Sequence, residues 1–233
     1  MTTQEIAKMI DHTNLNACAT SDEIERLCIE ARMNEFASVC VNPSYVSFAA
    51  ALLVNTGVKV CTVIGFPLGA DTIDNKATST AVAVDEGADE IDMVVNLGFV
   101  KEKDWDGVTE EISAVVDAAR EVEGDGEHIV VKVILETCYL TDDEIVECCK
   151  CAEIAGADFV KTSTGFAIIK DKDGKLLPNG ATVHAVEVMR KTVGDRLGVK
   201  ASGGIRNFAD AVKMVEAGAS RIGTSAGVAI VNS

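Results

Sequence analysis

Two lysines on short apolar segments, each followed by glycine, are the residues best suited to chemistry. Lys161 lies within Phe159–Gly165, and Lys200 lies within Val199–Arg206. An ammonium group in a strand needs a partner or a function, because an unpaired buried charge is costly. The glycines that follow allow backbone N–H groups to approach an anion closely. Together these features indicate covalent chemistry on the carbonyl group of a phosphorylated molecule.

The two lysines are expected on neighbouring strands, the sixth and seventh of the chain. Adjacent ammonium groups repel, so one of them should lose its proton more easily than a free lysine, whose pKa is about 10.4. A neutral amine attacks an aldehyde or ketone to form a Schiff base. The alternative is that both lysines pair with Asp92, Glu136 or Asp11 for structural reasons alone. That alternative is weaker, because two strand lysines exceed what packing of the fold requires.

Two more charged side chains lie on predicted strands. Asp92 faces the same side as Glu90 and points away from its apolar neighbours Ile91 and Met93. Such a carboxylate is a candidate acid or base, because burial and nearby amines set its pKa. Its alternative role is that of a structural partner for a buried lysine. Lys132 would pair with carboxylates if it points inward, and we expect it to support the site rather than to attack a substrate.

The chain alternates short β-branched segments with longer amphipathic segments, and no linker interrupts the alternation. The eight predicted strands are Met9–Thr13, Ala37–Val41, Lys59–Ile64, Glu90–Val95, Ile129–Leu135, Phe159–Lys161, Val199–Ala201 and Arg221–Gly223. The predicted helices are Ser21–Met33, Ser44–Thr56, Thr72–Glu86, Trp105–Glu121, Asp142–Ala155, Gly180–Thr192 and Phe208–Ala217. Alternation of this kind implies a parallel sheet.

A repeated joint between helix and strand favours one closed barrel. Gly87, Gly156 and Gly218 each stand between a predicted helix and the next strand, where glycine ends a helix in the left-handed conformation. Reuse of one joint fits a barrel of equivalent units better than an open sheet. No Gly-x-Gly-x-x-Gly turn follows an early strand, which disfavours a dinucleotide-binding fold. We therefore predict an α/β protein whose residues 1–233 form a single (β/α)8 TIM barrel domain with an extra N-terminal helix.

The barrel prediction places the active site at the carboxyl ends of the strands. Polar residues in or next to these ends are Asp11, Asn42, Asp92, Asn96, Glu136, Lys161 and Lys200. The turns Gly203–Arg206 and Gly223–Gly227 follow the last two strands, where such barrels commonly bind phosphate through backbone N–H groups and a helix N-terminus. Arg206 adds a permanent positive charge to this predicted phosphate site.

Composition excludes several classes of partner. Hydrophobic residues make up 48% of the chain and aromatic residues 4%, so the core must be built from Val, Ile, Leu and Ala. The formal net charge of −16 argues against nucleic acid and anionic membranes as partners. No apolar run is long enough to cross a bilayer, and Met1–Lys8 lacks the order of a secretory signal. We therefore expect a cytoplasmic protein.

The sequence predicts neither a metal ion nor another cofactor. Cys148, Cys149 and Cys151 lie in one predicted helix, but no second Cys or His pair follows at the spacing of a metal site. Small buried side chains are the better interpretation of these cysteines. The three histidines of the chain form no His-x-His or His-x-x-x-His pair.

Taken together, these segments resemble the deoxyribose-phosphate aldolase family, whose members are Schiff-base aldolases on the (β/α) barrel. The matching segments follow one another through nearly the whole chain: Ile10–Thr13, Val63–Ala70, Glu90–Gly98, Val131–Thr137, Val160–Phe166, Lys200–Arg206 and Gly223–Ser225. Val160–Phe166 and Lys200–Arg206 are highly specific in combination. The resemblance implies reversible cleavage of the sugar phosphate 2-deoxy-D-ribose 5-phosphate to D-glyceraldehyde 3-phosphate and acetaldehyde, without a metal ion.

The resemblance also implies a role for each matching residue. Lys161 matches the lysine that forms the Schiff base, Lys200 the lysine that perturbs it, and Asp92 the carboxylate that moves protons. The residues assigned to substrate binding are Asp11, Thr13, Thr164 and Lys132. The residues assigned to phosphate binding are Gly165, Gly203, Gly204, Arg206, Gly223 and Ser225.

The resemblance has one departure, at the C-terminus. Some members of the family continue into a flexible tail whose final tyrosine assists proton abstraction. This chain ends at Val231–Ser233, and its tyrosines are Tyr45 and Tyr139. Proton transfer is therefore expected to rest on Asp92, Lys200 and water.

Two other functions stay open at this point. One is a different lysine-dependent sugar-phosphate enzyme on the same barrel, such as a transaldolase-like enzyme. The other is a non-catalytic protein that binds a sugar phosphate, although the presence of both lysines together with Asp92 argues against it. Because homo-oligomers are common in the family, the resemblance also suggests a homodimer.

Overall fold

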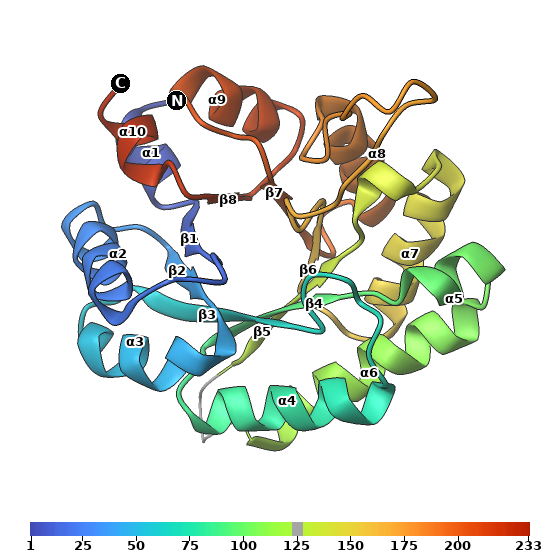
Figure 1. Cartoon of the computed structure of the whole chain (residues 1–233), viewed down its shortest axis with the longest axis horizontal. Helices are drawn as coiled ribbons and strands as arrows, with labels where there is room; N and C mark the ends of the chain where they lie inside the picture. Colours follow the sequence, from blue (N-terminus) through green and yellow to red (C-terminus); the bar gives the residue numbers. More distant parts are fainter. Residues whose placement is uncertain (123–127) are drawn as a thin grey trace.

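The computed structural model describes residues 1–122 and 128–233, and a closed barrel of parallel strands forms its centre (Figure 1). The strands are β1 (Ile10–Asn14), β2 (Ser38–Val41), β3 (Lys59–Ile64), β4 (Glu90–Val94), β5 (Val130–Ile134), β6 (Phe159–Lys161), β7 (Gly198–Ser202) and β8 (Arg221–Thr224). They follow one another around the barrel in sequence order, and β8 closes the barrel by pairing with β1. The predicted (β/α)8 TIM barrel is confirmed.

Helices surround the barrel on its outside (Figure 1). The longer helices are α2 (Ser21–Met33), α3 (Val46–Leu53), α4 (Ile73–Asp85), α6 (Trp105–Val122), α7 (Asp142–Ile154), α8 (Val183–Val193) and α9 (Phe208–Glu216), and each corresponds to a predicted helix. The shorter ones are α1 (Thr3–Ala7), α5 (Leu97–Glu102), α10 (Gly227–Val231) and the 3-10 turns η1 (Pro43–Tyr45) and η2 (Thr137–Tyr139). α1 is the predicted extra helix. The sequence does not predict α5 and α10, because such short segments show no amphipathic period.

Threonine caps and glycine joints define where several helices begin and end. Thr20 and Thr141 each accept a hydrogen bond from a backbone N–H in the first turn of α2 or α7, and each forms a capping box. Gly87, Gly156 and Gly218 have φ angles of +105°, +80° and +114°. These glycines end α4, α7 and α9 in the left-handed conformation that the repeated sequence joint predicts.

Charged side chains occupy the interior of the barrel, where branched apolar side chains usually pack. Asp92 on β4 is the register partner of Lys132 on β5, and Lys161 on β6 is the register partner of Lys200 on β7. All four side chains are buried. The alternate strand residues are apolar and pack with the helices, so the main hydrophobic core lies between the barrel and its outer layer.

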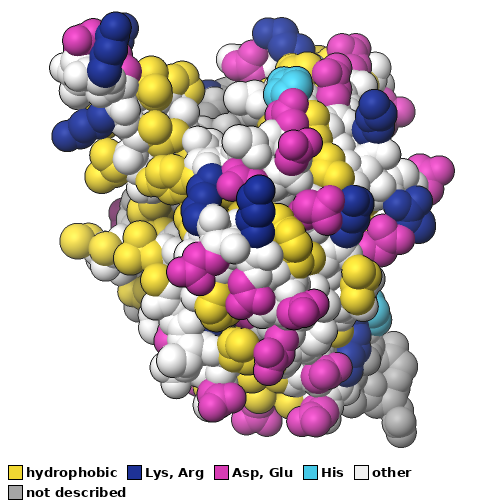
Figure 2. Space-filling view, turned by 90° about the vertical axis from the view of Figure 1, so that its right-hand side faces the viewer, with side chains coloured by type: hydrophobic (Ala, Val, Ile, Leu, Met, Phe, Trp, Pro, Cys, Tyr) yellow, Lys and Arg dark blue, Asp and Glu magenta, His cyan; other side chains and the backbone are white. Residues whose placement is uncertain are grey.

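The outer surface carries many acidic groups. Figure 2 shows Asp and Glu side chains scattered over the face that contains α5, α7 and α8, with Lys and Arg side chains among them. This face gives a nucleic acid backbone no broad positive area to bind, in keeping with the net charge of −16. None of the described helices has both the length and the apolar character that a bilayer-spanning segment needs.

Candidate active site

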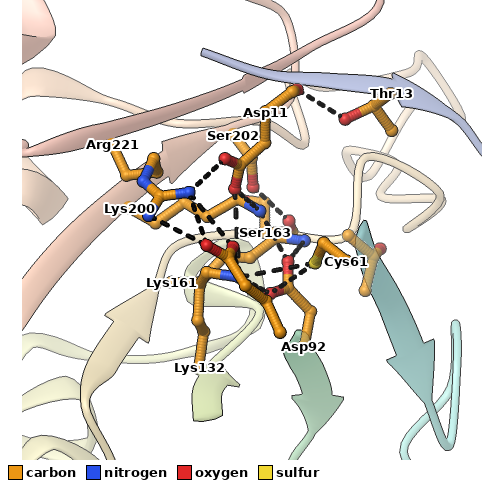
Figure 3. A network of polar contacts seen from close by, with 12 residues as sticks. Asp11, Thr13, Cys61, Asp92, Lys132, Lys161, Ser163, Lys200, Ser202 and Arg221 are labelled. Carbon is orange, nitrogen blue, oxygen red and sulfur yellow. Dashed lines mark hydrogen bonds and ion pairs between the residues drawn. The ribbon is translucent and has the colours of Figure 1, made fainter. Parts of the chain in front are cut away.

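Lys161 lies at the carboxyl end of β6 and contacts a buried carboxylate (Figure 3). Its Nζ lies 2.7 Å from Oδ2 of Asp92, and the Nζ of Lys200 lies 2.7 Å from the same oxygen. The Nζ of Lys132 lies 2.7 Å from the other carboxylate oxygen, Oδ1. One carboxylate therefore receives three ammonium groups, which the parallel register of β4 to β7 brings together.

A second layer of charges lies deeper in the barrel. Arg221 places its Nη1 2.6 Å from Oδ1 of Asp11 and 3.1 Å from Oε2 of Glu90. The Nζ of Lys132 lies 2.6 Å from the same Oε2, and Lys200 forms an ion pair with Asp11. Together the two layers form what we call the interior charge cluster, whose basic members are Lys132, Lys161, Lys200 and Arg221 and whose acidic members are Asp11, Glu90 and Asp92.

Mutual attraction outweighs burial in this cluster. Burial alone would raise the pKa of the Asp92 carboxyl, but the three surrounding ammonium groups hold it well below its usual value. Burial alone would lower the pKa of Lys200, but Asp11 and Asp92 hold it well above its usual value. The sequence predicts that one of the two adjacent lysines loses its proton readily. Lys200 is not that lysine, because two carboxylates keep it protonated.

A cavity of about 430 Å³ opens beside Lys161. It is lined by most of the residues predicted to bind substrate or phosphate: Thr13, Thr164, Gly165, Gly203, Gly204, Arg206, Gly223 and Ser225. Among the lysines of the described residues, Lys161 alone lines this cavity. Lys161 is therefore the amine that a carbonyl compound in the cavity can reach.

Asp11 and Lys132, two residues predicted to bind substrate, lie in the barrel interior. Both side chains are fully buried, and neither lines the cavity. Their strands direct them into the interior charge cluster, where Asp11 contacts Lys200 and Lys132 contacts Asp92. The structure thus shows contacts of both residues with other side chains of the cluster, and their binding to substrate stays a prediction.

Glu136 orders the segment that follows β6, a role that sequence reasoning did not assign. It comes two residues after β5 and has a φ angle of +56°, which residues other than glycine seldom adopt. Its carboxylate accepts hydrogen bonds from the backbone N–H of Thr164, at 3.2 Å, and from the Thr164 hydroxyl. Burial raises the pKa of Glu136. These bonds fix Thr164 at the cavity wall, near Lys161.

The turn after β7 brings backbone groups and one arginine to the cavity. Gly203 and Gly204 have φ angles of +88° and +81°. A Cβ atom at Gly203 would lie only 2.9 Å from the Cα of Gly180, so a side chain does not fit there. Arg206 follows this turn and is exposed, and no described residue forms a hydrogen bond or ion pair with it. Free N–H groups beside an unpaired guanidinium fit an anion such as phosphate.

Two buried thiols lie next to Asp92, and sequence spacing did not reveal them because they come from separate strands. Cys40 and Cys61 are register partners on β2 and β3, and the Sγ of Cys61 lies 3.3 Å from Oδ1 of Asp92. These three residues offer ligand atoms that all lie within 4.8 Å of one another. Three ammonium groups already contact the Asp92 carboxylate, however, and they would repel a metal cation at this position.

Several known proteins are similar to this chain over nearly its whole length. A protein named deoxyribose-phosphate aldolase from Caldanaerobacter subterraneus is 56% identical over 97% of this chain and 92% of its own. A protein of the same name from Lysinibacillus sphaericus is 52% identical over 98% of this chain and 96% of its own.

Solved structures agree with this similarity. The deoxyribose phosphate aldolase of Aeropyrum pernix, whose structure is described as a unique tetramer, is 34% identical and superposes with a TM-score of 0.87. The superposition covers 99% of this chain and 91% of that chain. A family model described as DeoC/LacD family aldolase matches residues 5–233. The match includes the whole barrel with its interior lysines, and the chain belongs to the DeoC/LacD aldolase family.

Proposed function

We propose that this aldolase reversibly cleaves 2-deoxy-D-ribose 5-phosphate to D-glyceraldehyde 3-phosphate and acetaldehyde, through a Schiff base on Lys161. The observation that carries the proposal is the position of this lysine. Its amine contacts the interior charge cluster through Asp92, and it also lines the cavity. The names of the similar proteins from Caldanaerobacter subterraneus and Lysinibacillus sphaericus support the same substrate.

Charge balance favours Lys161 as the neutral amine that the reaction needs. Each of the other three basic side chains in the cluster contacts at least two carboxylates. Lys161 contacts one carboxylate among the described residues, and it shares that oxygen with Lys200. If Lys161 is neutral, three cations face three carboxylates in the barrel interior. A neutral amine is the form that attacks a carbonyl carbon.

The proposed reaction follows from the position of this amine. The Nζ of Lys161 attacks the aldehyde carbon of the open-chain sugar, and loss of water gives a protonated imine. The imine accepts electrons when the C3 hydroxyl loses its proton and the bond between C2 and C3 breaks, which releases D-glyceraldehyde 3-phosphate. The enamine that is left takes up a proton at carbon. Water then hydrolyses the imine, frees acetaldehyde and restores the amine.

Asp92, Lys200 and water are the groups that we propose to move protons in these steps. The low pKa of Asp92 keeps it ionised at neutral pH, so it is able to accept a proton and has none to give. The Lys200 ammonium, 2.7 Å from the same carboxylate oxygen, compensates the negative charge of Asp92 while Lys161 is neutral. Thr13 and Thr164 line the cavity, and we propose that they position the substrate hydroxyls.

The phosphate group is proposed to bind where the loops after β6, β7 and β8 meet at the cavity. The contributing residues are Gly165, Gly203, Gly204, Arg206, Gly223 and Ser225. The backbone N–H groups of these turns would donate hydrogen bonds, and the Arg206 guanidinium would add charge. Because the protein is acidic overall, this local arrangement is what would make binding of a phosphate dianion favourable.

Borohydride trapping tests the proposed Schiff base. The protein is incubated with acetaldehyde, reduced with sodium borohydride, digested and mapped by mass spectrometry. We expect an ethyl adduct on Lys161 and none on Lys200, whose ammonium is held by two carboxylates. No adduct in folded protein, or an adduct confined to Lys200, would reject this mechanism. A panel of donor aldehydes and ketones then separates the proposed reaction from a transaldolase-like one, which would prefer the larger ketones.

We also propose that the barrel, residues 1–233, acts as one catalytic domain in the cytoplasm and as a homodimer. All eight cysteines carry free thiols, as expected in a reducing compartment, and the three on α7 pack in the hydrophobic core. The Aeropyrum pernix structure is described as a tetramer, so the assembly needs its own measurement. Light scattering coupled to size-exclusion chromatography gives the mass in solution, and a monomer or a tetramer would overturn the dimer.

A further inference from the structure

A second arginine lines the cavity, on a helix outside the barrel. Arg26 lies on α2, which packs beside β1 (Figure 1), and it borders the same cavity as Arg206 and Lys161. The sequence gives no reason to single it out, because a basic residue on an amphipathic helix is usually a solvated surface group. Its place on the cavity wall is a result of the tertiary structure.

The acidic residues one turn from Arg26 on α2 do not pair with it, and two of them have other partners. Glu23, one turn earlier on α2, accepts a hydrogen bond from the backbone N–H of Thr20 at 2.8 Å and completes the helix cap. Glu30, one turn later, contacts Nε2 of His12 at 2.7 Å. Oppositely charged residues three or four positions apart on a helix usually pair. Here none of the three, Asp22, Glu23 and Glu30, pairs with Arg26, and no described residue forms a hydrogen bond or ion pair with it.

The contact between Glu30 and His12 also places α2 close to the predicted phosphate site. His12 on β1 is the register partner of Thr224 on β8, the residue directly before Ser225. The cavity-lining side of α2 is therefore adjacent to the β8 turn, which the sequence assigns to phosphate binding. Arg26 and the β8 turn line one cavity, together with the Gly203–Arg206 turn.

We propose that Arg26 is a specificity-determining residue that binds the phosphate group of the substrate together with Arg206. This inference rests on the proposed sugar-phosphate aldolase function. A phosphate dianion has more acceptor sites than one arginine and a few N–H groups satisfy, and a guanidinium binds two of its oxygens at once. Arg26 has all its donors available for this purpose, and α2 supplies them from outside the barrel.

Substrate pairs with and without phosphate test this role. We compare Arg26→Ala, Arg206→Ala and Arg32→Ala, where Arg32 is an exposed arginine on the same helix that does not line the cavity. The measured quantity is the kcat/KM for 2-deoxyribose 5-phosphate divided by that for 2-deoxyribose. We expect Arg26→Ala to lower this ratio about tenfold, as loss of a hydrogen bond to a charged group does. Arg26→Lys should recover part of the loss, and Arg32→Ala should leave the ratio within about twofold of wild type.

Two controls keep this inference separate from the proposed function. Borohydride trapping with acetaldehyde needs no phosphate, so Arg26→Ala should form the Lys161 adduct as the wild type does. Calorimetric titration with inorganic phosphate needs no turnover, so it tests Arg26 even if the wild type proves to have another activity. Phosphate affinity should fall in Arg26→Ala and stay unchanged in Arg32→Ala. Unchanged phosphate affinity in Arg26→Ala, or an equal loss with both sugars, would overturn the assignment.

Discussion

The net pKa shifts in a buried ion pair outside the barrel are opposite to those in the interior charge cluster. Lys76 on α4 and Glu111 on α6 form the outer pair, and neither side chain is exposed. Burial lowers the pKa of Lys76 and raises that of Glu111, so desolvation outweighs the attraction between the two groups in both shifts. In the interior charge cluster, the pKa directions of Asp92 and Lys200 favour the charged forms.

The number of opposite charges around each group explains this difference. Lys76 forms an ion pair with one carboxylate, and its other hydrogen bonds go to the backbone carbonyls of Gly69 and Val94, each at 2.8 Å. A single attraction does not offset the desolvation of two ions. In the interior charge cluster each carboxylate contacts at least two basic side chains. Each carboxylate therefore gains several electrostatic attractions, while its desolvation cost is incurred a single time.

The two regions also differ in their access to a cavity and in their numbers of basic and acidic side chains. The outer pair has equal numbers of positive and negative charges and is closed off, and it joins α4 and α6 to the end of β4. The interior charge cluster has one basic side chain in excess, and that side chain, Lys161, lines a cavity. Buried charge alone therefore does not identify an active site. A surplus amine at a cavity wall is the more specific sign.

The largest expected effect is on turnover when the surplus amine is removed. Lys161→Ala should lower kcat for 2-deoxyribose 5-phosphate by about a thousandfold or more, because no nucleophile replaces it. Lys161→Arg keeps a basic side chain but has no nucleophilic amine, so it should be equally inactive. Thermal unfolding of both variants should stay close to wild type, since Asp92 keeps two other ammonium groups. Activity near wild type in either variant would remove Lys161 from the mechanism.

The next effect is on stability when the shared carboxylate is neutralised. Asp92→Asn leaves four basic side chains facing two carboxylates in the barrel interior. Removing one partner from a buried ionic network costs about 3–5 kcal/mol, which urea unfolding would measure. Asp74→Asn, at an exposed position on α4, is the matched control and should change stability by less than about 0.5 kcal/mol. Equal unfolding midpoints for the two variants would contradict a stabilising role of the Asp92 carboxylate among the basic side chains of the cluster.

The outer pair should tolerate joint replacement, unlike the cluster. Lys76→Met alone leaves Glu111 buried without its cation and should lower the free energy of unfolding by about 3 kcal/mol. The double variant Lys76→Met/Glu111→Leu removes both desolvated ions, so it should return to within about 1 kcal/mol of wild type or exceed it. Turnover of the folded double variant should match wild type, because neither residue lines the cavity. A double variant less stable than the single one would show that this pair is a net stabiliser.

The smallest effect is the dependence of stability on pH, which should have opposite sign in the two regions. The folded-state pKa of Asp92 lies below its unfolded value of about 3.9. Its stabilising contribution is therefore complete above that pH and is lost as the pH falls toward the folded-state pKa. The folded-state pKa of Glu111 lies above its unfolded value of about 4.3, so its contribution is present below that pH and is lost as the pH rises through the folded-state pKa.

A pH series of urea unfolding separates these two signs. The free energy of unfolding of Lys76→Met/Glu111→Leu, taken relative to that of wild type, should increase as the pH rises from about 4.3. The increase should be less than about 1.4 kcal/mol per pH unit. The stability deficit of Asp92→Asn should instead stay constant near neutral pH and shrink below about pH 4. Parallel curves for the two variants would mean that the net pKa shifts of Asp92 and Glu111 have the same sign.

Much of the fold and the core of the site follow from local sequence patterns. The apolar neighbours of Lys161, Lys200 and Asp92 mark strands, and the glycine joints mark a repeated unit, so the barrel and the meeting of these three residues are predictable. Alternation along β4 even gives the inward direction of Asp92. The phosphate turns are predictable for a similar reason, since loops after the last two strands of a barrel share one edge.

The remaining parts depend on contacts that no short pattern records. Lys76 sits in an amphipathic helix, where a lysine at a solvated position has the same local sequence, and only the packing of α4 on α6 buries it. Arg26 is similar, because its place on the cavity wall depends on the packing of α2 beside β1. The contacts of Lys132 and Asp11 within the interior charge cluster are a further case, because the sequence gives the direction of a strand residue but not its depth in the barrel.

The closing contact between Arg221 and Asp11 joins residues 210 positions apart in the chain. Asp11, on the first strand, also neutralises Lys200 on the seventh, so the charges of the barrel interior come from both ends of the polypeptide. Without β8 the barrel would be open, and Asp11 would lose its contact with Arg221. The charges around Lys161 therefore depend on closure of the barrel, because Asp11 binds both Arg221 on the last strand and Lys200, which shares the Asp92 carboxylate with Lys161.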